Sequence, residues 1–311
     1  MVNIVEEYQS KKSVIVWRIV DGKPGHEAQT LGLVRALEAY FAVECYEVPA
    51  CRDFDGFTQW LRGRFVAGSD LPKPDLIVGA GHRTHWSLLA AKRATGGKAV
   101  VLMKPSLPRL LFDLCIIPEH DGPAPGANVL ITKGVLNPIQ QSTDASPQKG
   151  LLLIGGPSTH HDWDSADLFA QIEQVVSADS SIQWTLTTSR RTPGECTEQL
   201  CALEYANLEV VPVERTPIGW VANQLGACGR VCVTEDSISM IYEALTSGAV
   251  VGLFSVPRKR KLSRVVDAIE TLVAEQHILR FDKVPKAEIG AVPPLDEARR
   301  CAEQVYSLLK R

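Results

Sequence analysis

The stretch VCVTEDSISMIYEALTSGAVVGLF, residues 231–254, decides the fold of this chain. Residues 231–233 favour a strand, a polar turn follows at 234–237, and the next apolar residues recur at the spacing of an amphipathic helix: Ile238, Ile241, Tyr242 and Leu245. Gly248 is typical of a helix end, and the apolar run 249–254 predicts a strand buried on both faces. The stretch therefore predicts a strand–helix–strand unit of a parallel sheet.

The polar residues of this helix suggest a ligand site. Asp236, Ser239 and Glu243 lie roughly along one side of it. The unpaired N–H groups near Ser237 could hold a phosphate, and the carboxylate of Glu243, about 10 Å further along, could accept both hydroxyls of a ribose. The alternative is that Asp236 caps the helix and Glu243 is a solvated surface residue.

Length and composition indicate a large two-domain protein. The chain has 311 residues, of which 45% are hydrophobic, enough to bury a core in each of two domains. The 33 basic and 36 acidic residues give a net charge of −3, which argues against a nucleic-acid partner and restricts any anion site to a local cluster.

Cysteine spacing and hydropathy favour a cytoplasmic location. None of the 8 cysteines has CxxC spacing, so we interpret them as reduced core thiols. The opening residues, MVNIVEEYQSKK, lack the apolar segment of a signal peptide, and no stretch approaches the roughly 18 apolar residues that span a bilayer.

The first half opens with a strand at 13–20 and the glycine turn DGKPGHE at 21–27. Such a turn lies outside the carboxyl end of a strand, where α/β folds bind ligands. Gly22 and Gly25 leave room beside the backbone, and Asp21 is a further candidate for substrate contact. His26 falls near the helix start, where the dipole disfavours its cationic form and suits it to act as a base. The alternative is a tight turn with no ligand.

A second glycine turn, GAGHRTH, follows another short strand. Gly81 and Arg83 are candidate substrate contacts, Arg83 as a partner for an anion. His82 and His85 are three residues apart and could ligate a metal, but the sequence offers no third ligand nearby. We therefore expect no metal.

The first half ends in a polar cluster and a linker. Glu119 and Asp121 belong to the tetrapeptide PEHD, which follows a predicted strand and should lie near a cleft. The polar, proline-containing segment 136–150 is typical of an interdomain linker. We expect three parts: an N-terminal acceptor domain at 1–140, a C-terminal donor domain at 150–293, and a helix at 294–311 that could cross back to the first domain.

The second half repeats the pattern of glycine turns and polar strand ends. Ser158, in the turn GGPS, could donate to a phosphate, whereas His160 and His161 are expected to be exposed. Arg190 and Arg191 follow a predicted strand, and their planar guanidinium groups suit a diphosphate. A solvated pair is the alternative for these arginines.

A basic cluster follows the decisive stretch. Its members could contact an acidic or phosphorylated substrate, or the inner membrane surface in a peripheral association. The plain alternative is a solvated basic surface. The cluster comprises Arg258, Lys259, Arg260 and Lys261.

As a set, these motifs resemble a known family. DGKPGHE, GAGHRT, FDLCIIPEHD, GGPS, TSRRTP and VTEDSISMIYEALTSG look like the plant mitochondrial-fission ELM proteins and their bacterial relatives, which are regarded as GT-B glycosyltransferases. The resemblance covers residues 14–268. DGKPGH and IGGPS also resemble glycine turns of the lipid II-forming N-acetylglucosaminyltransferase. The resemblance implies an α/β fold of two Rossmann-like domains with parallel sheets that face each other across a cleft, the GT-B type.

The resemblance also implies a donor site, in which Glu243 binds the donor ribose. The site residues that it implies are Ser158, Arg190, Arg191, Ser237, Ser239 and Glu243. The chain departs from the family at two places. Glu235 adds a negative charge beside the expected diphosphate, which costs affinity for the diphosphate unless Arg190 and Arg191 compensate that charge. The segment MKPSL at 103–107 lacks the expected glutamine-rich run.

Our first functional hypothesis is metal-independent glycosyl transfer from a nucleotide-diphospho-sugar co-substrate to a glycan or lipid-linked acceptor, as in the synthesis of cell-envelope polysaccharide. His26 is the preferred base, with Glu119 and Asp121 as alternatives, while the helix dipole and the arginines stabilise the departing diphosphate. Two rival hypotheses remain: a nucleotide-sugar epimerase or hydrolase of the same fold, and a non-catalytic recruitment factor like the plant fission proteins.

Overall fold

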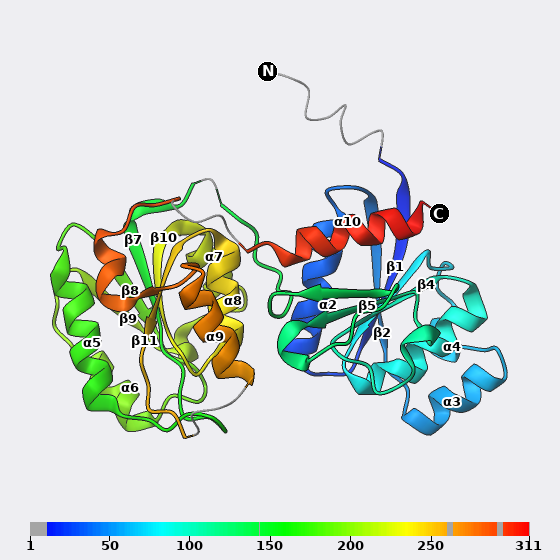
Figure 1. Cartoon of the computed structure of the whole chain (residues 1–311), viewed down its shortest axis with the longest axis horizontal. Coiled ribbons are helices and arrows are strands. Elements are labelled where there is room, and N and C mark those ends of the chain that lie inside the picture. Colours follow the sequence, from blue (N-terminus) through cyan, green and yellow to red (C-terminus); the bar gives the residue numbers. More distant parts are fainter. Residues whose placement is uncertain (1–10, 143, 260–263, 291–294, 311) are drawn as a thin grey trace, which may run out of the picture. The chain divides into compact units, whose positions relative to one another are not determined.

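The chain folds into two compact units, each built on a six-stranded parallel sheet (Figure 1). The computed structural model describes residues 11–142, 144–259, 264–290 and 295–310. Unit 1 comprises residues 1–138 and 296–311, and unit 2 comprises residues 139–295. The predicted α/β class with two parallel sheets is confirmed.

Unit 1 has the strand order β2-β1-β3-β4-β5-β6. Its strands are β1 (Ser13–Val20), β2 (Ala42–Pro49), β3 (Leu76–Ala80), β4 (Lys98–Leu102), β5 (Leu114–Pro118) and β6 (Val129–Thr132). Its helices are α2 (Pro24–Leu37), α3 (Asp53–Leu61), α4 (His85–Thr95) and α10 (Glu297–Leu309). The strand order changes direction between β1 and β3, so this is a topological switch point.

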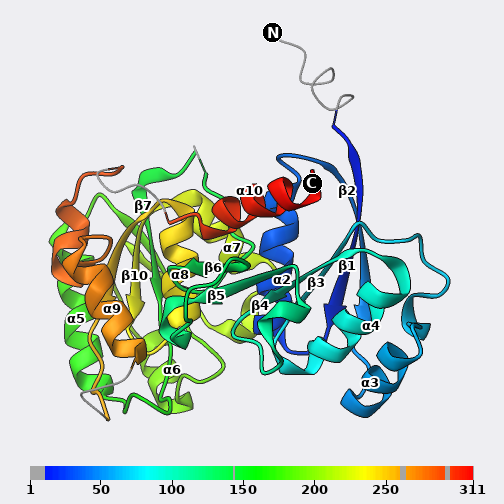
Figure 2. The ribbon, with the colours of Figure 1, turned by 45° about the vertical axis from the view of Figure 1, so that its right-hand side comes forward.

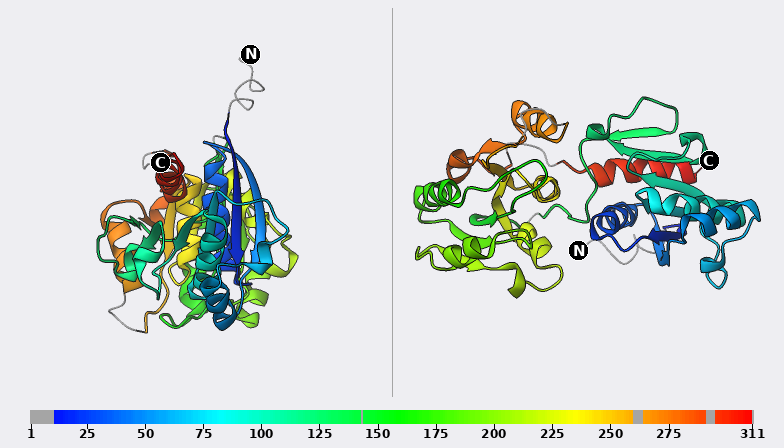
Figure 3. Two further views of the ribbon diagram at one scale, coloured as in Figure 1. Left: turned by 90° about the vertical axis from the view of Figure 1, so that its right-hand side faces the viewer. Right: turned by 90° about the horizontal axis from the view of Figure 1, so that it is seen from below.

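The core of unit 1 lies on both faces of its sheet. Helices α2 and α10 cover one face, where Leu33 and Cys301 are fully buried with Val16 of β1. Figure 2 shows α10 beside α2. Helix α4 covers the other face through Leu88, which packs with Ile77 of β3. In Figure 3 the sheet of unit 1 is seen with helices on both sides.

Unit 2 has the strand order β12-β11-β10-β7-β8-β9, which changes direction between β10 and β7. Its strands are β7 (Ser146–Leu153), β8 (Gln183–Thr187), β9 (Leu208–Val211), β10 (Cys228–Thr234), β11 (Val250–Phe254) and β12 (Leu279–Arg280). Its helices are α5 (Ser165–Ala178), α6 (Gly194–Cys201), α7 (Trp220–Ala227), α8 (Ile238–Ser247) and α9 (Arg264–Ala274). Helices α5 and α6 share a core cluster with β7 and β8, and α7 and α8 pack on β7, β10 and β11.

The strand–helix–strand unit predicted from residues 231–254 is present as β10, α8 and β11. Strands β10 and β11 pair in parallel, with Val231 opposite Val251. Gly248 ends α8 with φ +85°, a conformation that only glycine adopts without strain.

Two predicted boundaries were wrong. The linker predicted at 136–150 overlaps β7, which begins at Ser146 and pairs with β10 through backbone groups. Its first residues are polar because they extend beyond the core, and backbone pairing does not depend on side-chain polarity. The helical spacing of Phe54, Phe57, Trp60 and Leu61 in the sequence predicts a helix over 54–66. That helix ends at Leu61, because Gly63 takes φ +62° and the chain turns there. Within the described residues, no helix is both long enough and apolar enough to cross a membrane.

Candidate functional site

Each unit has candidate residues at its own topological switch point. In unit 1 the turns after β1 and β3 carry Asp21, His26 and Gly81, and the chain continues into helices on opposite faces of the sheet. In unit 2 the corresponding turns, 155–158 and 234–237, follow β7 and β10. Open α/β sheets bind ligands outside the carboxyl ends of their strands at such a point.

Asp21 and His26 form a hydrogen-bonded pair in unit 1. His26 Nδ1 lies 3.0 Å from Asp21 Oδ2, and the side chains of His26 and Asp21 are 17% and 1% exposed. The backbone N–H of Lys23 donates to the other carboxylate oxygen of Asp21 at 3.2 Å. Because a carboxylate only accepts, Nδ1 carries the hydrogen of this contact, and in the neutral ring Nε2 then has the lone pair. The arrangement is that of an oriented general base.

Glycines make room for the His26 ring. A Cβ on Gly81, which has φ +78°, would lie 2.3 Å from His26 Cε1, so only glycine lets the ring rest against this turn. Gly22 has φ +79°, and its N–H donates to Glu27 Oε1 at 3.1 Å. Gly25 lies in the first turn of α2, and a Cβ there would meet nothing within 4 Å. The start of α2 therefore leaves open space beside Gly25.

Two of the other candidates of unit 1, Glu119 and Asp121, are not brought to His26. Arg83 is exposed in a short 3₁₀ turn, His82–Thr84, ahead of α4. Glu119 and Asp121 follow β5, which is three strands from β1, or roughly 14 Å at the usual strand spacing. Asp121 accepts from the backbone N–H of Lys104 at 3.4 Å, whereas Glu119 is exposed. The geometry therefore favours His26 among the three proposed bases.

In unit 2, Asp236 ties the two switch-point turns together. Its Oδ2 accepts from the backbone N–H of Gly156 at 3.1 Å and from Arg191 Nη2 at 2.7 Å. The side chain is fully buried, and a Cβ on Gly155 would lie 2.3 Å from Oδ2. Asp236 therefore neither caps α8 nor lines its outer side, contrary to both sequence interpretations, because Gly155 leaves space for its carboxylate inside the turn.

Neither Arg190 nor Arg191 compensates the charge of Glu235. Arg258 supplies that compensation instead, because its guanidinium donates to Glu235 Oε2 at 2.6 Å through Nη2 and 3.0 Å through Nε. Arg191 pairs with Asp236 and also donates to the carbonyl of Gly156 at 2.8 Å. Arg190 is exposed, with no ion pair or hydrogen bond within the described residues. Of the two arginines, Arg190 is thus the one whose whole guanidinium could meet a ligand.

The basic cluster at 258–261 is not a free cationic surface where the structure describes it. Arg258 also pairs with Glu270 at 2.7 Å. Lys259 Nζ lies 3.4 Å from Asp162 Oδ1 and donates to the carbonyl of Ser158 at 2.9 Å. Arg260 and Lys261 lie outside the described residues.

Ser158 and His161 form a closed local structure. Ser158 Oγ accepts from the backbone N–H groups of His160 at 3.2 Å and His161 at 3.1 Å, so its hydroxyl oxygen is already used. His161 is buried rather than exposed as predicted, because its ring packs beneath the turn within 3.4 Å of Ser158 Oγ. Burial lowers the pKa of His161, although Glu235 and Asp236 oppose that shift. A neutral histidine is therefore part of the turn.

Helix α8 starts at the switch point without a side-chain cap, so its first N–H groups remain available to a ligand. Ser237 precedes the helix and Ser239 is exposed in its first turn. Glu243 is half-buried, and no described residue forms an ion pair or hydrogen bond with its carboxyl. Burial raises the pKa of Glu243 to about 7 from its usual value of 4.5. A positive helix end and an unpartnered carboxyl thus occur on one helix.

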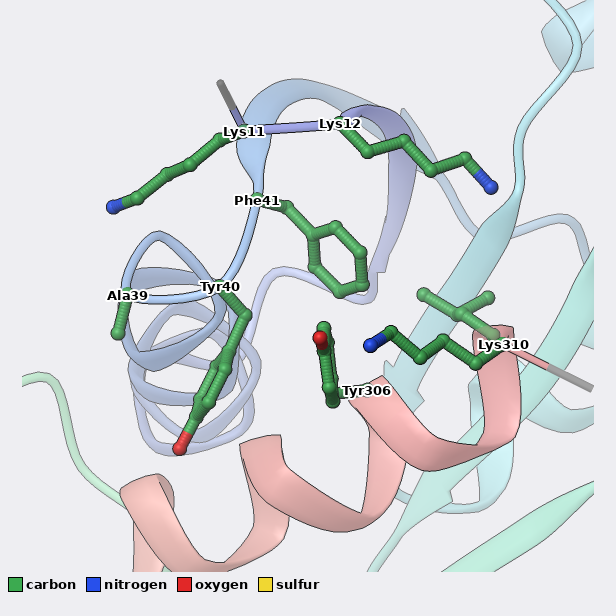
Figure 4. Close-up of a pocket in the computed structure, with 8 residues that line it drawn as sticks. Lys11, Lys12, Ala39, Tyr40, Phe41, Tyr306 and Lys310 are labelled. Atoms are coloured by element: carbon green, nitrogen blue, oxygen red, sulfur yellow. The ribbon is translucent and has the colours of Figure 1, made fainter. Parts of the chain in front are cut away.

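A separate pocket of about 440 Å³ lies at the opposite edge of the unit 1 sheet, where β1 begins (Figure 4). Lys11 Nζ donates to the carbonyl of Glu38, just after the end of α2, at 2.9 Å. Lys310 Nζ lies 4.1 Å from the centre of the Tyr306 ring at the end of α10. Lysines at helix C-termini offset the negative end of the dipole, which accounts for the positive charge here.

The histidines considered for a metal do not converge. His85 is buried and its Nδ1 lies 3.2 Å from Ser106 Oγ, whereas His82 is exposed. The pKa of His85 is lowered to about 4, mainly by burial and to a smaller extent by the nearby charge of His82. Across the described ranges there is no group of three or more histidine, cysteine, aspartate or glutamate residues that could hold a metal ion.

Two parallel α/β units, each with a candidate site at its switch point, define a two-domain protein of the GT-B type. The chain belongs to the mitochondrial fission ELM1 family, whose model matches residues 24–309. An uncharacterized protein of Rickettsia prowazekii (strain Madrid E) is 25% identical, covering 95% of this chain and 98% of that protein.

Solved structures share the fold at low sequence identity. A candidate UDP-N-acetylglucosamine 2-epimerase from Listeria monocytogenes matches with a TM-score of 0.60, 13% identity and coverage of 96% of both chains. A UDP-GlcNAc 2-epimerase from Neisseria meningitidis, solved with UDP-GlcNAc bound, matches with a TM-score of 0.50 and 11% identity, covering 96% of this chain and 100% of that chain. These likenesses support the GT-B fold.

Proposed function

We propose that this protein is a metal-independent glycosyltransferase, in which unit 2 binds a nucleotide-diphospho-sugar and unit 1 binds the acceptor. The observation that carries the proposal is Glu243, a half-buried carboxyl with no partner among the described residues, on the helix that starts at the unit 2 switch point. Leaving such a group unpaired is costly, which is expected where a ligand supplies the missing hydrogen bonds.

The donor fits along α8. The helix start and the exposed guanidinium of Arg190 can neutralise a diphosphate, since both supply positive charge or N–H donors. Glu243 lies about 9 Å further along the axis than Ser237, at 1.5 Å per residue, and its two oxygens can accept both hydroxyls of the ribose. Ser239 and Ser237 offer hydroxyl groups beside the diphosphate. Arg191 and Ser158 shape the turn instead of contacting the ligand.

The acceptor reacts at His26. In the proposed step, the acceptor O–H bond breaks and its proton moves to His26 Nε2, while Asp21 stabilises the imidazolium that forms. The acceptor oxygen bonds to the anomeric carbon of the sugar, and the bond from that carbon to the diphosphate breaks with its electron pair leaving on the phosphate oxygen. Arg83, Gly22 and Gly25 border the acceptor.

Product analysis tests this proposal. We would incubate the protein with nucleotide-sugars of uridine, guanosine and cytidine, with and without glycan or lipid-linked acceptors, and identify the products by mass spectrometry. Glycosyl transfer predicts a nucleotide diphosphate and a glycosylated acceptor, both lost in His26→Ala. Donor consumption without acceptor would replace the proposal with an epimerase or hydrolase. Binding of no nucleotide by the folded protein would favour a non-catalytic recruitment factor.

A further inference from the structure

Helix α3 lies at the margin of the core of unit 1, against which its Trp60 packs. It packs on α4 rather than on the sheet, and Figures 1 and 2 show it beyond α4. Gly56 is its one buried residue. A Cβ at this position would lie 2.8 Å from Trp86 Cβ, so the close contact with α4 requires glycine. Residues 57–60 of the helix are half-buried, whereas residues 53–55 and 61 are exposed.

The open surface of α3 is apolar and aromatic. Phe54 is 76% exposed and Leu61 is 53% exposed, and their seven-residue spacing places both on one side of the helix. Phe57 and Trp60 are half-buried between them and α4, with ring centres 4.8 Å and 5.6 Å from the Trp86 ring. A rigid aromatic base thus supports two large exposed apolar side chains, which folding within this unit does not explain.

Cationic side chains surround this surface. Four exposed arginines lie just before α3, just after it or on α4, compared with two exposed aspartates in the first turn of α3. Among described residues, none of the four forms an ion pair. Arg93 stacks over Trp60, with its guanidinium carbon 5.4 Å from the ring centre. The charged residues are Arg52, Arg62, Arg64, Arg93, Asp53 and Asp55.

We propose that α3 docks unit 1 on an anionic lipid surface. Helices that lie in the interface of a bilayer typically combine exposed Phe and Leu side chains with Trp and a border of arginine, as this surface does. The charge complementarity is with lipid headgroups, because the excess of arginine over aspartate favours anionic lipid. This surface, comprising Phe54, Phe57, Trp60 and Leu61 with the four arginines, differs from the basic cluster at 258–261.

The position of α3 relates this surface to the candidate site of unit 1. Helix α3 begins four residues after the end of β2, the strand next to β1, and therefore at the same sheet edge as Asp21 and His26. A bilayer bound by α3 would lie at the edge where the proposed acceptor reacts. That consequence, a lipid-linked acceptor, rests on the proposed function, whereas docking itself does not.

Vesicle flotation tests the docking. The full chain is mixed with phosphatidylcholine vesicles, or with vesicles that also contain phosphatidylglycerol, and the bound fraction is measured with Phe54→Glu/Leu61→Glu and with Arg62→Glu/Arg64→Glu. We expect binding to the anionic vesicles alone, and a loss of about tenfold or more in either variant. The matched control is Leu110→Glu/Ile218→Glu, which adds the same charge at residues that are 91% and 106% exposed elsewhere.

Three results would overturn the proposal: no binding by the native chain, equal binding by Phe54→Glu/Leu61→Glu, or equal loss in the control. Circular dichroism and thermal unfolding establish that the variants fold. Light scattering identifies the rival occupant, because a native mass of two chains that falls to one only in Phe54→Glu/Leu61→Glu would show that α3 joins two copies. Since flotation needs no donor or acceptor, its outcome is independent of the glycosyl-transfer assay.

Discussion

Asp21 holds His26 through a 3.0 Å contact between Asp21 Oδ2 and His26 Nδ1. The carboxylate is almost fully buried, whereas the imidazole ring is 17% exposed. The two residues are five apart and lie on either side of the turn after β1. A buried acceptor on one ring nitrogen fixes the orientation of the ring, as general-base catalysis by a histidine requires.

Asp21→Asn should lower the rate of glycosyl transfer without removing donor binding. An asparagine can present its amide to Nδ1 and stabilise the wrong tautomer, so we expect a loss of about 10²-fold to 10⁴-fold in kcat, in the range of general-base contributions. Steady-state kinetics with titration of the nucleotide measures this. An unchanged kcat in a folded Asp21→Asn would exclude His26 as the base.

Gly25→Ala should raise the stability of the protein and at the same time weaken its use of the acceptor. The new methyl group has free space around it, and alanine in a helix is favoured over glycine, so the free energy of unfolding should rise by about 0.5–1 kcal/mol. The same methyl group would narrow the proposed acceptor space and raise KM for the acceptor. Denaturant unfolding and acceptor kinetics are the measurements, and an unchanged KM would remove Gly25 from the acceptor site.

Arg191→Ala should destabilise unit 2 by leaving Asp236 buried without its cation. We expect a loss of about 1–3 kcal/mol in urea unfolding, the usual cost of an unsatisfied buried polar or charged group. Arg190→Ala is the matched control and should change stability by less than about 0.5 kcal/mol, because Arg190 is exposed. Equal effects of the two substitutions would contradict the structural role of Arg191.

Glu243→Gln should stabilise the ligand-free protein at alkaline pH. The pKa of Glu243 is raised to about 7 in the fold from 4.5, so the folded state binds the extra proton between these values and its stability falls as pH rises through that window. Removing the ionisable group should therefore raise the Tm more at pH 8 than at pH 5. The corresponding difference in the free energy of unfolding is on the order of 1–3 kcal/mol once partial exposure is allowed for. The measurement is thermal unfolding at both pH values, and a Tm difference independent of pH would refute the assignment.

Donor binding should have the opposite pH dependence. A protonated Glu243 offers fewer acceptors to the ribose hydroxyls, so nucleotide affinity should weaken as pH falls below about 7. Titrations between pH 6 and pH 8 measure the slope. Affinity that rises as pH falls would place another group at the ribose.

The two candidate sites could be proposed from the sequence because their residues follow strands in local patterns. The glycine turn 21–27 and the stretch 231–254 could be interpreted from spacing alone. The partners of the acidic turn could not, because Arg191 and Arg258 are 45 and 23 residues from Asp236 and Glu235. No periodicity connects residues so far apart, and only the fold brings them together. The burial of His161 has the same cause, since it depends on how the turn folds.

The most direct test of the donor site is calorimetric titration of the native chain with UDP, GDP, CMP and their sugar conjugates, beside Glu243→Ala and the exposed control Glu198→Ala. We predict saturable binding of one nucleotide that Glu198→Ala retains and Glu243→Ala loses. Binding of none of the nucleotides by the folded native chain, or undiminished binding by Glu243→Ala, would contradict the assignment of the donor site to α8.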